Sequence, residues 1–286
     1  MTTCFQRGRV GSLVTTLAAM LVATLVAAAG AARAQDGGAP PTSPMQVVKV
    51  EGLADPDARS YRRMLKGMDA FEAHHALAPL ATLRYRLTPR LADVRADGVH
   101  LRLQGSAGAT PIALADDLTF VLPRDDKLLA DGAEVVSNRK ARSFAWGPDV
   151  RTPGLPPNTR RLGDLRLECQ IDRAASLLVG LKTPSYYVLE ASVDVCNMLF
   201  GAWLYYAERA IFNVTLVHGA RRQVLLSPFL YASMAPTAIQ IFYDFYRYLI
   251  DRTYHIRVSD QSWPDDTLVE LEYMDDGMVA SNGGAP

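Results

Sequence analysis

Residues 147–172 constrain the fold more than any other stretch, because two opposite patterns meet there. The first half is rich in proline and glycine and predicts an irregular, basic arm. The second half, residues 164–172, alternates apolar and polar side chains, which is typical of a strand with one buried face. Cys169 lies on the apolar side of this alternation. We therefore predict a half-buried strand that carries an inward-facing cysteine.

The N-terminal segment has the pattern of an export signal. Two arginines precede an apolar run that contains no acidic residue, and residues 32–34 form a small-x-small cleavage site. We therefore expect residues 1–34 to be a signal peptide cleaved between Ala34 and Gln35, which makes the chain periplasmic or secreted. A retained membrane anchor is the alternative, because the apolar run approaches the length that spans a bilayer.

Charge argues against one class of partner. Cleavage would remove three arginines and no acid, leaving 27 Lys and Arg against 30 Asp and Glu. Such a near balance gives no electrostatic footprint for nucleic acid, so we predict no nucleic acid partner.

Two cysteines, Cys169 and Cys196, follow the export signal. An exported chain meets an oxidising compartment, and two cysteines allow only one pairing, so we predict a disulfide between them. The CxxC spacing of redox proteins is absent, which makes the predicted bridge structural. Two buried thiols are the alternative.

The remaining chain predicts one domain with flexible ends. Residues 35–45 lack apolar periodicity and form a flexible leader, and residues 277–286 form a disordered tail. Between them, residues 46–276 are long enough to bury a sizeable core as a single globular domain.

Local patterns predict an α+β fold class. It has an antiparallel β-sandwich-like core, an N-terminal helix and two inserted aromatic-rich helices. The first helix should begin at the capping signal of Asp55 and Pro56 and span residues 56–77. The aromatic helices are predicted at residues 187–209 and 237–250. Alternating patterns predict strands at residues 83–87, 99–103, 118–122, 133–137, 212–216, 222–226, 254–258 and 269–273.

Basic residues around the proline-rich arm are the candidate site for an anionic partner. Such a partner would be an envelope polysaccharide, a lipid head group or an acidic peptide. The alternative is a solvated loop that pairs with acidic residues near the C-terminus, since charge runs usually solvate or pair loosely. The candidate residues are Arg139, Lys140, Arg142, Arg151, Arg160 and Arg161.

Glu72 and His75 are the candidate metal ligands. They lie three residues apart on the predicted helix, a spacing used by metal sites in helical bundles. They support the hypothesis of a metal-dependent hydrolase, although a catalytic metal needs a third protein ligand. His75 also lies four residues after Phe71, so the alternative is that it covers the apolar stripe of the helix.

Aromatic residues are concentrated in the C-terminal third of the chain, and three interpretations are open. They could form core, or an exposed patch that docks on a membrane surface or another partner. They could also form a ligand pocket for sugars or lipids. The candidate pocket residues are Trp203, Tyr205, Tyr206 and Phe242.

Catalytic motifs are missing from the sequence. It contains no GxSxG, GxGxxG, P-loop or HExxH pattern. We therefore expect an exported bacterial envelope protein with a non-catalytic binding or assembly role, without a cofactor, whose partner is an envelope polysaccharide, lipid or protein. The alternatives are the hydrolase above and an envelope protein that docks on the membrane through its aromatic helices.

Overall fold

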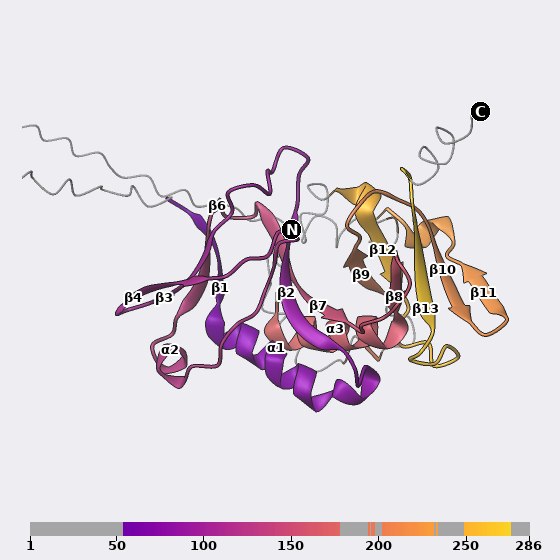
Figure 1. Cartoon of the computed structure of the whole chain (residues 1–286), viewed down its shortest axis with the longest axis horizontal. Coiled ribbons are helices and arrows are strands. Elements are labelled where there is room, and N and C mark those ends of the chain that lie inside the picture. Colours follow the sequence, from indigo (N-terminus) through magenta and orange to yellow (C-terminus); the bar gives the residue numbers. More distant parts are fainter. Residues whose placement is uncertain are drawn as a thin grey trace, which may run out of the picture. The chain divides into compact units, whose positions relative to one another are not determined.

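Antiparallel strands dominate the described part of the chain, as the computed structural model shows in Figure 1. The structure describes residues 54–177, 194, 196–197, 202–231, 233 and 249–275, all within the unit Glu51–Pro286. Few helices accompany these strands, which confirms a β-rich α+β fold. The predicted signal peptide, leader and tail lie outside the described residues.

Thirteen strands, three α-helices and three short 3-10 helices occur within the described ranges. The strands are β1 (Pro56–Ser60), β2 (Thr82–Pro89), β3 (Leu101–Gly105), β4 (Gly108–Ile112), β5 (Thr119–Phe120), β6 (Glu134–Lys140), β7 (Phe144–Arg151), β8 (Thr159–Arg161), β9 (Trp203–Tyr206), β10 (Ile211–His218), β11 (Arg221–Val224), β12 (Thr253–Ile256) and β13 (Leu268–Tyr273). The helices are α1 (Tyr61–Ala73), η1 (His75–Leu77), α2 (Asp126–Ala130), α3 (Leu162–Ala175), η2 (Ser227–Phe229) and η4 (Ile250–Arg252).

The described strands pair in two groups along the chain. In the N-terminal group the sheet orders are β1-β6-β3-β4 and β5-β2-β7. In the C-terminal group they are β11-β10-β13-β8 and β12-β9. Strand β8 pairs with the much later strand β13.

The eight predicted strands are all present, with shifted ends, and β10 and β11 pair as an antiparallel hairpin. The prediction for the first helix is wrong at its start. Helix α1 begins at Tyr61 rather than Pro56, because the preceding residues form β1. There Ala58 pairs with Val136 on β6. Buried Asp57 accepts a 3.2 Å hydrogen bond from the Phe144 amide, so sheet pairing outweighs the helix-start signal.

Two predictions for residues 147–172 are wrong. The arm is partly regular, because β7 and β8 occupy its two ends. The predicted strand at residues 164–172 is the helix α3. Along a helix two residues turn by about 200°, so an alternating pattern places apolar side chains on two opposite faces.

Helix α3 is buried on both of these faces. Leu167 and Ile171, four residues apart, belong to the apolar core beneath β2 and β7. Leu165 and Cys169, also four apart, belong to the core formed with β9, β10, β12 and β13. The alternating pattern of residues 164–172 therefore belongs to a helix that lies between two apolar cores, and not to a strand.

Close packing holds α1 against α3. A Cβ atom added at Gly67 of α1 would lie 2.7 Å from the Tyr85 hydroxyl and 3.0 Å from the Ala175 Cβ. The Tyr85 hydroxyl itself donates a 2.6 Å hydrogen bond to the Met64 carbonyl. Glycine at this position therefore sets the distance between the two helices.

The predicted disulfide between Cys169 and Cys196 is confirmed, with a Cα–Cα distance of 6.0 Å. The prediction of a helix through residues 187–209 is wrong at its C-terminal end, where β9 lies. Most of the rest of that helix, and residues 237–248 of the second aromatic helix, fall outside the described residues. Within the described ranges, no helix has the length and apolar character to cross a membrane.

Candidate functional site

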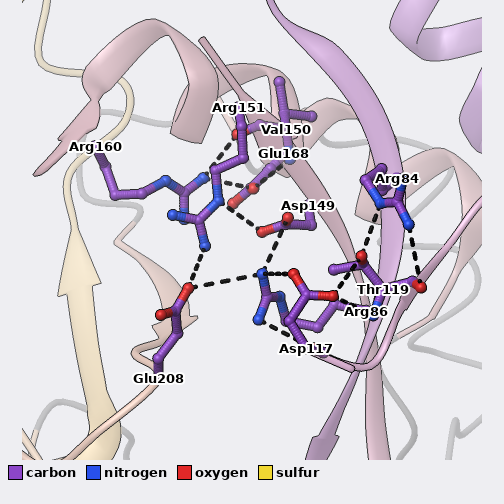
Figure 2. Close-up of polar contacts among 10 residues, drawn as sticks. All are labelled: Arg84, Arg86, Asp117, Thr119, Asp149, Val150, Arg151, Arg160, Glu168 and Glu208. Carbon is purple, nitrogen blue, oxygen red and sulfur yellow. Dashed lines mark hydrogen bonds and ion pairs between the residues drawn. The ribbon is translucent and has the colours of Figure 1, made fainter. Parts of the chain in front are cut away.

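A cleft of about 360 Å³ is bordered by β2 and β7, by the inner side of α3 and by β9 with the residues that follow it. Its floor is charged and part of its wall is aromatic. Figure 2 shows the charged residues. We use the term charge network for two neighbouring sets of ion-paired residues there. The first set is Arg86, Arg151, Asp117, Asp149 and Glu208, and the second is the pair Arg160 and Glu168.

Side chains of α3 replace a neighbouring strand along the free edge of β7. The Val150 amide donates a 2.8 Å hydrogen bond to Glu168, and the Thr152 amide donates a 2.9 Å bond to Asp164. Two residues of a strand span about 6.6 Å and four residues of a helix about 6 Å, so the two pairs match in spacing. The helix thereby fixes the edge of β7 that borders the cleft.

Arg160 closes a ring with the same segment of β7. Its guanidinium donates a 3.0 Å hydrogen bond to the Val150 carbonyl and a 2.6 Å bond to Glu168. Both side chains are buried, so the pair is shielded from water. Burial raises the pKa of the Glu168 carboxyl, whereas the guanidinium of Arg160 and the Val150 amide oppose that rise.

Asp149 anchors the two cleft arginines that are nearer to solvent. Its Oδ1 accepts a 2.9 Å hydrogen bond from Arg151 and its Oδ2 a 3.3 Å bond from Arg86. Burial alone would raise the pKa of the Asp149 carboxyl, but the guanidiniums of Arg151, Arg160 and Arg86 hold it below its ordinary value. Asp149 is therefore a fixed anion at neutral pH.

Glu208 lies at the rim, on the turn after β9, and approaches the same two arginines (Figure 2). Its carboxylate is 3.2 Å from Arg151 and 3.6 Å from Arg86, yet its side chain is 56% exposed. The backbone of the turn is held separately, since Arg252 donates a 3.0 Å hydrogen bond to the Glu208 carbonyl. On the other side of Arg86, Asp117 lies 3.4 Å away and is also exposed.

Aromatic side chains supply the apolar wall of the cleft. Trp203 and Tyr206 of β9 are half-buried and line it, as does buried Trp146 of β7. Tyr205 also borders the cleft, but its ring packs on Tyr254 at 5.7 Å and its hydroxyl donates a 2.6 Å bond to α3. Three of the candidate pocket residues therefore line the cleft, whereas Phe242 lies outside the described residues.

The structure separates the six candidate basic residues. Only Arg151 and Arg160 reach the cleft. The other described contacts are elsewhere: Arg139 donates to the Asp97 carbonyl, and Arg161 donates a 3.2 Å bond to the Asp265 carbonyl. Lys140 is exposed at the end of β6, and Arg142 lies in the turn that follows.

Glu72 and His75 have other partners. Glu72 accepts a 2.8 Å hydrogen bond from Arg124, and the His75 ring lies 4.6 Å from the Phe71 ring, as the apolar-stripe alternative expected. In the described part of the chain, no group of three or more His, Cys, Asp or Glu side chains is placed to hold a metal ion.

Sequence reasoning missed most of the charge network. Arg86 was recognised only as the polar side of a strand, and Asp149 as part of the arm. Glu168 was assigned to the solvent face of a predicted strand, although it is 5% exposed. One signal was present in the sequence. Polar residues, most of them ionisable, alternate with apolar ones over residues 164–172, and a helix buried on both faces produces this pattern as well as a strand does.

Comparisons with known proteins give no relative: no family model, no curated protein and no solved structure matches the chain.

Proposed function

We propose that the chain is an exported bacterial envelope protein that binds a saccharide in the cleft and does not catalyse a reaction. The observation that carries this proposal is the union of an aromatic wall and a charged floor in one cavity of about 360 Å³. This volume lies within the range of small-molecule sites. Sugars offer apolar faces to aromatic rings and hydroxyls to charged groups, so both surfaces suit them.

A binding role fits the carboxylates of the floor better than catalysis does. Both oxygens of Asp149 are engaged by arginines, and its pKa is held below the ordinary value. A general acid or base works best with a pKa near the working pH. Glu168 is likewise committed to Arg160 and to the Val150 amide.

Export is supported by the disulfide between Cys169 and Cys196, because such bridges persist in oxidising compartments. This half of the proposal is tested by expressing the full chain with a signal-dependent export assay in a bacterial host. Mass spectrometry of the exported product should find an N-terminus at Gln35, and a product that retains residues 1–34 would contradict cleavage.

The binding half of the proposal is tested with one aromatic variant and one control. Oxidised protein is titrated by calorimetry with neutral and acidic oligosaccharides. Trp203→Ala should weaken binding by about tenfold, the scale of a lost aromatic contact. Phe212→Ala is the matched control, because Phe212 is 60% exposed on β10 and does not line the cleft. Equal effects of both variants, or no binding of any saccharide, would contradict the proposal.

We also propose that the C-terminal strands form a sandwich-like unit. Val214 and Val269 come from the sheet that contains β10 and β13, and Tyr254 and Ile256 come from β12. All four belong to one buried apolar cluster, as expected when two sheets share a core. Nuclear Overhauser contacts between the valine methyls and the Tyr254 ring would test this packing.

A further inference from the structure

We infer that the cleft binds the carboxylate of an acidic sugar by exchange with Glu208. Glu208 itself occupies the place proposed for the ligand carboxylate, between Arg86 and Arg151 (Figure 2). This inference rests on the proposed function, since it specifies the saccharide class for the same cleft.

The two arginines converge on one oxygen of Glu208. Its Oε1 lies 3.2 Å from Arg151 Nη2 and 3.6 Å from Arg86 Nη2. Guanidinium groups recognise carboxylates through their planar set of donors, so a pair of them forms a carboxylate site. A ligand carboxylate placed there would gain the same partners.

Glu208 is the exchangeable carboxylate of the site and Asp149 is the permanent one. The Asp149 side chain is 8% exposed and is bonded through both oxygens, whereas the Glu208 side chain is 56% exposed. Arg151, the nearer of the two arginines, is 38% exposed, and an ion pair that reaches solvent on both sides contributes little to stability. Releasing Glu208 into solvent is therefore an inexpensive step.

The backbone of the turn does not need to move during this exchange. Arg252 donates to the Glu208 carbonyl, and the Ala207 amide donates a 2.8 Å bond to the Arg252 carbonyl. Rotation of the Glu208 side chain alone would vacate the place between the arginines.

Charge balance favours exchange over simple addition. Apart from Glu208, the charge network contains three arginines and three carboxylates. Glu208 adds one negative charge, and a ligand carboxylate that replaces it leaves the total unchanged. Binding of an anion beside a retained Glu208 would instead bring two like charges together, which is unfavourable.

The matched probes are trigalacturonate and its methyl ester, which differ in charge but share the sugar. Calorimetry on the oxidised chain should show tighter binding of the acid. Glu208→Gln should strengthen acid binding by about threefold, because an exposed competing ion pair is removed. Arg151→Gln should weaken acid binding by about tenfold, the scale for a lost charge-assisted contact.

A control variant and the thermal midpoint guard against a purely structural effect. Glu72→Gln removes an exposed carboxylate that pairs with Arg124 outside the cleft, and it should leave acid binding unchanged. Variants are compared only if their melting temperatures show a folded chain. Weaker or unchanged acid binding by Glu208→Gln would overturn the inference.

Failure of the inference and failure of the proposed function are distinguishable. If acid and ester bind equally in all variants, the saccharide function stands and the carboxylate exchange is wrong. If neither saccharide binds while an acidic peptide does, both are wrong.

Discussion

Arg160 and Glu168 form a buried ion pair at 2.6 Å that joins strand β8 to helix α3. Each of them also bonds to Val150 of β7, through its carbonyl and its amide respectively. Three elements of the chain therefore meet at one charged ring. Burial alone would lower the pKa of the Arg160 guanidinium. The attraction of nearby groups, led by the Glu168 carboxylate, outweighs burial and raises the pKa of Arg160.

Removing one member of this pair should strongly destabilise the protein. Glu168→Gln leaves the Arg160 guanidinium buried without its counter-charge, so the free energy of unfolding should fall by about 3–5 kcal/mol. Urea unfolding followed by circular dichroism measures it. The control is Glu270→Gln: Glu270 also lies 2.6 Å from its partner Arg222, but both are exposed. Its loss should cost about 1 kcal/mol or less, and equal losses would contradict the role of burial.

The disulfide should contribute measurably to stability. Cys169 and Cys196 are 27 residues apart in sequence, and closing a loop of this length stabilises the folded state by about 3.5 kcal/mol in the chain-entropy model. The double variant Cys169→Ala, Cys196→Ala should lose about that much in urea unfolding. Thiol titration is the independent check: unfolded, unreduced chain starting at Gln35 should show no free thiol, and two would contradict the bridge.

Gly67→Ala should destabilise the protein despite a favourable change in helix propensity. Alanine gains about 1 kcal/mol over glycine in a helix. The added Cβ would nevertheless lie 2.7 Å from the buried Tyr85 hydroxyl. Overpacking of this kind costs about 1–3 kcal/mol, so the melting temperature should fall. Gly147→Ala is the steric control, because no heavy atom lies within 4 Å of its added Cβ. A higher melting temperature for Gly67→Ala would contradict the conclusion that close packing of α1 on α3 requires glycine at this position.

His255 should make the protein less stable in mild acid. Burial lowers its pKa from 6.5 to about 4, against the opposing hydrogen bond to the Phe229 backbone. Between these pH values the unfolded chain binds a proton that the folded chain does not. The free energy of unfolding should therefore fall as the pH drops from 6.5 to 4, by up to about 3 kcal/mol from this group.

The contribution of His255 can be isolated from that of the carboxylates. Unfolding free energies of the original protein and of His255→Gln are measured across the same pH range. The original protein should lose stability relative to His255→Gln as the pH falls, because only the original protein carries the cost of protonating a buried histidine. A difference that stays constant with pH would contradict the assignment to His255.

Strands were the most predictable part of the fold. Periods of two near Leu83 and Leu216 each correspond to a strand that buries one face. Helix α3 was not predictable in the same way, because a helix with two buried faces produces the same alternation as a strand. The decisive information was the pair of cores around it, which depends on residues far away in the sequence.

The candidate site was predictable only in fragments. Arg151, Arg160 and Trp203 were recognised as possible binding residues, and all three border the cleft. The carboxylate partners of the two arginines come from β7, α3 and the turn after β9, so no local sequence spacing reveals these ion pairs. Asp149 was hidden in a segment whose proline and glycine content suggested no regular structure, although Pro148 is compatible with an edge strand.

The pairing of β8 with β13 has a consequence for the order of events during synthesis. Arg160 lies opposite Val269, so β8 has no strand partner until nearly all of the described chain has left the ribosome. Long-range pairing of this kind slows folding. Cys169 and Cys196 both precede β13 along the chain, so the disulfide does not depend on the pairing of β8 with β13. During refolding of the oxidised or the reduced chain, the β8–β13 pairing should therefore be among the last contacts to form.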